Sequence, residues 1–91
     1  MQDSPHVDMN YMQIRILEYL HDHRDRAPVS LQRLRDRIDP NLPSAVIHNV
    51  LELDHIGLVV IFKHADETKM VAITPRGIVV YNDLLARRGC A

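Results

Sequence analysis

Apolar residues recur every three or four positions in the first third of the chain, the spacing that lets a helix bury one face. The stripe consists of Met12, Ile16, Leu17 and Leu20. It predicts a helix over about 9–23, and Asn10 with Gln13 at its start is typical of a capping box. The preceding residues show no periodicity, so 1–8 are expected to form a flexible N-terminal arm.

Two further helices follow in the hydrophobic pattern. Leu31, Leu34 and Ile38 form a narrow apolar stripe that predicts a second helix. Ser30 is its N-cap, and Val29 is expected to pack as a lead-in or a one-bridge strand. A third helix is predicted over 43–56, because proline suits its first turn and apolar residues then recur at helical spacing. Gly57 follows, where a helix end favours the left-handed conformation.

The pattern then changes to short runs of β-branched and aromatic residues. Leu58 to Phe62 and Met70 to Thr74 predict two strands, joined by a polar turn over 63–69. Thr74 followed by Pro75 is a typical helix start, and the last helix is expected to end near Gly89. The order helix, short strand, helix, helix, strand, strand, helix is that of a winged helix-turn-helix, mainly α with a small β-hairpin. A single domain is expected over 9–88, with 89–91 as a C-terminal tail.

Size and composition limit the functional classes. The chain has 91 residues and a formal net charge of −1, with 46% hydrophobic and 25% charged residues, which fits one ordinary globular domain. No apolar run reaches the ~20 residues of a membrane span, and a single cysteine is typical of a reducing cytoplasm. No glycine-rich phosphate loop, activated nucleophile or paired carboxylates are present, so no catalytic residue and no cofactor is predicted.

Three segments resemble bacterial and archaeal winged-helix regulators of the MarR, PadR and ArsR kind. They are Ile14 to Leu20 in the first helix, Leu53 to Val59, and Ile73 to Gly77. The second is similar to the family's Leu-Glu-x-x-Gly-Leu-Val segment, and the third to its Leu-Thr-Pro-x-Gly segment. The resemblance implies a transcriptional regulator, with repression as the expected action, that places helix 43–56 in the DNA major groove and the 63–69 hairpin on the backbone.

Carried onto this chain, the resemblance implies a set of residues that contact double-stranded DNA. The groove-facing side of the third helix would present Ser44, Ala45, His48, Asn49 and Glu52. Phosphates would meet Ser30 and Arg33 near the second helix, and Lys63 and Lys69 beside the hairpin tip. Asn49 carries one amide donor and one acceptor, which are the groups that read adenine.

The charge distribution keeps a second interpretation open. No lysine or arginine lies between Arg37 and Lys63, so the third helix carries Glu52 but no cation. Ile47 and Leu51 also widen its apolar arc. A winged helix that binds another protein and not DNA would account for these features. The sequence identifies no small-molecule effector, and its histidines form no recognised zinc-ligand set, so no metal site is predicted.

The last helix has a broad apolar surface. Its apolar residues include Ile78, Val79, Tyr81, Leu84 and Leu85. A small three-helix core is not expected to cover so wide a face alone, and a second copy of the chain would do so. These five residues are therefore the predicted homodimer interface. Packing against the first helix, whose own stripe is also wide, is the alternative.

Overall fold

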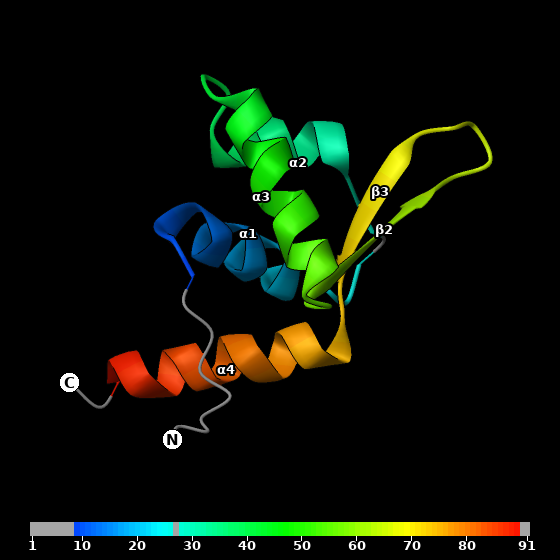
Figure 1. Cartoon of the computed structure of the whole chain (residues 1–91). Coiled ribbons are helices and arrows are strands. Elements are labelled where there is room, and N and C mark those ends of the chain that lie inside the picture. The colour runs from blue at the N-terminus through cyan, green and yellow to red at the C-terminus, as the bar shows by residue number, and fades with distance from the viewer. Residues whose placement is uncertain (1–8, 27, 90–91) are drawn as a thin grey trace.

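Four helices and a small sheet form the part of the chain that the computed structural model describes, residues 9–26 and 28–89 (Figure 1). The elements in order are α1 (Tyr11–Asp22), β1 (Val29–Ser30), α2 (Leu31–Ile38), α3 (Pro43–His55), β2 (Val59–Lys63), β3 (Lys69–Ile73) and α4 (Pro75–Gly89). This order confirms the predicted winged helix-turn-helix. Gly89 belongs to α4 and not to a tail, while the expected arm at 1–8 and residues 90–91 lie outside the described part.

The sheet is antiparallel, with strand order β1-β3-β2. Val29 pairs with Val71, so the predicted lead-in is a short strand at the sheet edge. The β2–β3 hairpin pairs from Val59 opposite Ile73 to Lys63 opposite Lys69. In Figure 1 this hairpin projects away from the helices, while α4 lies on the other side of the body.

The core joins all four helices to the sheet. Its fully buried side chains are Ile16, Leu17, Leu34, Val46, Val50, Leu53, Leu58, Val59 and Val71. Burial of such aliphatic side chains, each contributing about 1.5–3 kcal/mol of transfer free energy, is the main stabilising term of the fold. The core fixes α3 with one face inward and the opposite face in solvent.

Both predicted helix caps are present. The Gln13 amide nitrogen donates to Asn10 Oδ1 at 2.8 Å, and the Asn10 amide nitrogen donates to Gln13 Oε1 at 3.2 Å. This is a reciprocal capping box. At the start of α2, the Arg33 amide donates to the Ser30 hydroxyl at 3.0 Å. Each cap satisfies a backbone donor that its helix cannot satisfy itself.

The junction between α3 and β2 is a Schellman turn. Gly57 has a φ of 83°, its amide donates to Asp54 O at 3.1 Å, and the Leu58 amide donates to Leu53 O at 2.9 Å. These two bonds satisfy carbonyls at the helix end, and the left-handed residue turns the chain directly into the strand. The predicted role of this glycine is confirmed.

The start of α4 is tied to this same turn. The Thr74 hydroxyl donates to Gly57 O at 2.7 Å and accepts from the Gly77 amide at 3.0 Å. The Thr74 amide donates to Leu58 O at 3.1 Å. Thr74 therefore caps α4 and also holds it against the α3–β2 junction. This contact gives a physical reason for the Thr-Pro-x-Gly pattern.

No helix in the described part of the chain has both the length and the apolar character that crossing a membrane requires.

Candidate nucleic-acid interface

The face of α3 that points away from the core contains most of the predicted groove-facing residues. Ser44, His48 and Glu52 are exposed, whereas Ala45 is half-buried. His48 Nε2 lies 3.5 Å from Glu52 Oε2, one turn further along the helix. The face therefore presents a hydroxyl, an imidazole and a carboxylate to solvent.

Asn49 does not belong to this face, and the prediction that it reads bases in the groove is wrong. Its side chain is only 9% exposed. Its Nδ2 donates to Ala45 O at 2.8 Å and contacts Met12 Sδ at 3.2 Å, while its Oδ1 accepts from Asn10 Nδ2 at 2.9 Å. The amide joins α3 to the N-cap of α1 and has a structural role.

Leu51 lies in the middle of the exposed face of α3 and is 53% exposed. Together with His48, Glu52, His55 and Ile56 it lines a shallow hollow of about 330 Å³. The outward face of α3 is thus partly apolar, and it carries no lysine or arginine. Its chemistry favours contact with bases or with apolar groups over contact with phosphates.

The hairpin tip combines cations with carboxylates. Lys63 and Lys69 face each other across the strands, and Lys63 Nζ lies 3.5 Å from Glu67 Oε1. Asp66 Oδ1 accepts from the Thr68 amide at 3.0 Å, and hydrogen bonds from the Thr68 side chain and backbone lower the pKa of Asp66 below its usual 3.8. Both predicted lysines are at the tip, but two carboxylates reduce its positive potential.

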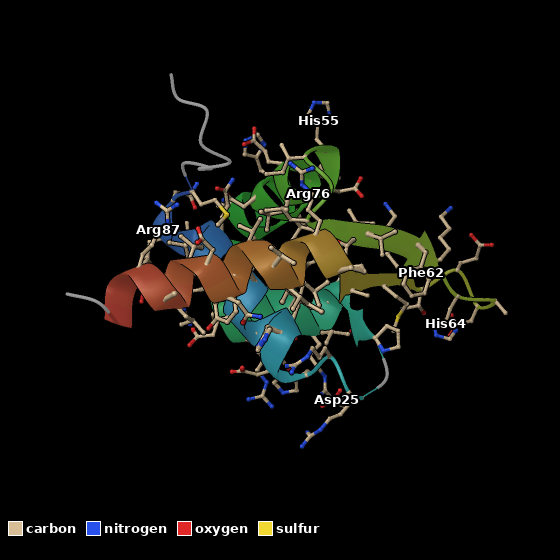
Figure 2. The ribbon with its side chains drawn as sticks, turned by 90° about the horizontal axis from the view of Figure 1, so that it is seen from below. Asp25, His55, Phe62, His64, Arg76 and Arg87 are labelled. Atoms are coloured by element: carbon tan, nitrogen blue, oxygen red, sulfur yellow. The ribbon has the colours of Figure 1, made fainter. Side chains whose placement is uncertain are left out.

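Ser30 and Arg33 lie beside a different hollow, on the side of α2 that faces the end of α1 and the edge strand. This hollow is also lined by Arg26 and Arg37, which the predicted DNA-contacting set did not include. Figure 2 shows that His55, at the end of α3, and Asp25, next to Arg26, lie at opposite sides of the molecule. The hollow that contains the arginines shares no lining residue with the hollow on the exposed face of α3. The spacing of Arg33 and Arg37 one turn apart on α2 is a sequence signal for these two arginines, but not for Arg26.

The predicted dimer residues of α4 divide into two groups. Tyr81 is only 4% exposed within the single chain, and its ring lies 4.8 Å from that of His21 on α1. Its assignment to a dimer interface is wrong, because α1 already covers it. Val79 and Leu85 are 67% and 43% exposed, and Ile78 and Leu84 are half-buried. These four residues remain available for a partner.

Within the described residues, no three His, Cys, Asp or Glu side chains gather closely enough to hold a metal ion.

Comparison with solved structures identifies the architecture. MepR, a transcription regulator of the Staphylococcus aureus multidrug efflux pump MepA, aligns over 87% of this chain and 57% of its own, with 18% identity and a TM-score of 0.78. The chain has a winged-helix fold similar to that of MepR. A MarR-family transcriptional regulator from Rhodococcus matches this winged helix over 87% of this chain and 55% of its own, at 23% identity and a TM-score of 0.70. A small protein from Ralstonia eutropha matches over 85% of this chain and 98% of its own, at 19% identity and a TM-score of 0.70.

The winged helix thus spans a little more than half the length of MepR and of the Rhodococcus regulator. A mutant of MepR bound to an oligodeoxyribonucleotide also has this fold, with 15% identity, 89% of this chain and 61% of that chain aligned, and a TM-score of 0.74. Comparison with models of protein families finds no match, and comparison with curated proteins finds none either.

Proposed function

We propose that this chain is a transcriptional regulator that binds double-stranded DNA in the cytoplasm, with α3 in the major groove and the β2–β3 hairpin on the neighbouring backbone. The observation that carries the proposal is the fold: a structurally similar mutant of MepR is bound to an oligodeoxyribonucleotide, and in this chain one face of α3 is exposed and the hairpin projects from the body. Ser44, His48 and Glu52 are the side chains offered to base edges, and Ala45 contributes a small surface beside them.

Few cations are available to contact DNA phosphates, and the number of these contacts determines how strongly the affinity depends on salt. Lys63, Lys69 and Arg33 are the proposed phosphate contacts, with Ser30 beside them. Three neutralised phosphates give a slope of log K against log salt of roughly −2.7, or about a 40-fold loss of affinity between ~50 mM and ~200 mM salt. The proposed regulator therefore binds non-specific DNA weakly and depends on base contacts for its affinity.

Fluorescence anisotropy with a labelled mixed-sequence duplex at those two salt concentrations tests the proposal. Lys69→Gln removes about one phosphate contact and is therefore expected to reduce the magnitude of the salt slope by about 0.9. Arg76→Gln removes the same charge from the exposed start of α4 and is expected to leave the slope unchanged. Absence of binding at low salt, or equal effects of both substitutions, contradicts the proposal.

A second candidate function rests on Leu51. Its exposure on a helix without cations favours a winged helix that binds another protein through α3. Glu52→Lys separates the two functions. If α3 faces DNA, the substitution raises non-specific affinity because it replaces a charge that repels phosphate. If α3 binds a protein, it abolishes capture of that partner and leaves DNA affinity low.

The regulator is proposed to act as a homodimer and to repress. The exposed apolar residues of α4 support the dimer, and a dimer implies a pseudo-palindromic operator with half-sites about one helical turn apart.

A further inference from the structure

An open, arginine-rich hollow lies between the end of α1, the edge strand β1 and the flank of α2. It has a volume of about 680 Å³, and its polar lining is Tyr19, His23, Arg26, Ser30, Arg33 and Arg37. None of the described residues that line it is an aspartate or a glutamate. Three arginines therefore line one concave surface, and no described residue of that lining carries a carboxylate.

Two stacked rings, held in place by a hydrogen bond, line one side of the hollow. The rings of Tyr19 and His23 stack with centroids 4.1 Å apart and an angle of 29°. His23 Nδ1 lies 2.8 Å from Tyr19 O, and because a carbonyl only accepts, Nδ1 carries the hydrogen. Ser30 uses its oxygen to accept from the Arg33 amide, which leaves its hydroxyl hydrogen available as a donor. The Nδ1 hydrogen of His23 is thus already used within α1, and the Ser30 hydroxyl is the donor that this side of the hollow offers beside the arginines.

Such an arrangement is unfavourable when empty. Arg33 and Arg37 are one helical turn apart, and like charges at this spacing repel each other. An anion between the guanidinium groups would convert the repulsion into attraction. Guanidinium donors form a planar fork that matches the oxygens of a phosphate, so a phosphate group fits this lining chemically.

We propose that this hollow binds a phosphate-bearing ligand, with Arg26, Arg33 and Arg37 as its anion contacts. The volume lies within the range of small-molecule sites, large enough for a phosphate group together with an organic substituent. None of the described residues that line the hollow belongs to α3, so a bound ligand leaves the outward face of that helix accessible. The proposal extends beyond DNA binding: the hollow shares Ser30 and Arg33 with the proposed phosphate contacts of the regulator, whereas Arg26 and Arg37 belong to the hollow alone.

Isothermal titration calorimetry with inorganic pyrophosphate tests the site. Saturable binding is expected for the natural sequence, and Arg37→Gln is expected to weaken it about tenfold or more, because it removes a charge-assisted hydrogen bond. Arg76→Gln is the matched control: it removes one exposed arginine outside the hollow and is expected to change affinity less than twofold. No saturable binding, or equal weakening by both substitutions, overturns the proposal.

The source of the phosphate is resolved by repeating the titration with a saturating DNA duplex. If pyrophosphate still binds, the ligand of the hollow is a free phosphorylated compound. If the duplex displaces pyrophosphate and Arg37→Gln weakens duplex binding to the same extent, the hollow holds a backbone phosphate. Both results support a phosphate site. Arg37 is not among the proposed DNA contacts of α3 or the hairpin, so failure here is distinct from failure of the proposed regulator.

Discussion

Gly77 in the first turn of α4 is predicted to tolerate no side chain. A Cβ built at this position meets the Leu58 carbonyl oxygen far inside van der Waals contact and lies 2.7 Å from Ile73 Cγ1. The carbonyl is backbone and accepts the Thr74 amide hydrogen bond, so it has little freedom to move. Gly77→Ala must therefore push α4 away from the α3–β2 junction.

The cost of this substitution follows from three opposing terms. Overpacking in a well-packed site costs up to ~3 kcal/mol. Disturbing the Thr74 hydrogen bonds lowers the free energy of unfolding by about 1 kcal/mol more. The higher helix propensity of alanine raises it by about 1 kcal/mol. The net loss of unfolding free energy is about 3 kcal/mol, which for a domain of this size lowers Tm by roughly 12–24 °C.

Thermal and urea unfolding followed by circular dichroism measure this loss. Gly57→Ala makes the same chemical change at a position where the new Cβ meets only Arg76 Cδ at 3.8 Å. Its cost is backbone strain at a φ of 83°, about 1 kcal/mol. The explanation is refuted if Gly77→Ala is as stable as the natural sequence, or is less destabilised than Gly57→Ala.

Three further predictions concern α3, the hairpin and α4. Asn49→Ala should lower the free energy of unfolding by about 1–3 kcal/mol in urea denaturation, since buried partners lose their hydrogen bonds; an unchanged value would contradict its structural role. The folded pKa of Asp66 is lowered, so its stabilising contribution is present above pH 3.8 and is lost as pH falls through the lowered value. In an NMR titration, Thr68→Val should raise that midpoint toward 3.8, and an unmoved midpoint would exclude the hydroxyl as the cause. Leu85→Glu should shift the proposed dimer to monomer in light scattering, and a dimer that persists would place the interface elsewhere.

The order of elements was predictable because its determinants are local. Caps at Asn10 and Ser30, the left-handed turn at Gly57 and the Thr74–Pro75 helix start each act within a few residues of the chain. Element ends agree with the structure to within two residues for the same reason.

The predictions for Asn49 and Tyr81 were wrong because a segment distant in the sequence determines what covers each side chain. Asn49 lies at helical spacing from Val46 and Leu53 on the buried face, but its polar side chain suggested an exposed position. Its partner Asn10 is 39 positions away, and no local pattern reveals that hydrogen bond. Tyr81 is a similar case: the periodicity of α4 shows that the ring is buried, but not whether its own α1 or a second copy covers it.

The arginine hollow was predictable only in part. Arg33 and Arg37 share a flank of α2 because they lie one helical turn apart, but the third arginine, Arg26, reaches the hollow because the chain turns back after α1 into β1. Tertiary structure, and not helical spacing, brings Arg26 beside the other two.

The central claim, that α3 and the hairpin form the DNA-contacting surface, is tested most directly by NMR. Amide chemical shifts of the ¹⁵N-labelled protein would be followed during titration with a DNA duplex at low salt. The proposal predicts that shifts concentrate at 44–55 and 63–69, while those of α4 stay small. Shifts confined to the hollow around Arg26 and Arg37, or no shifts at all, would contradict it.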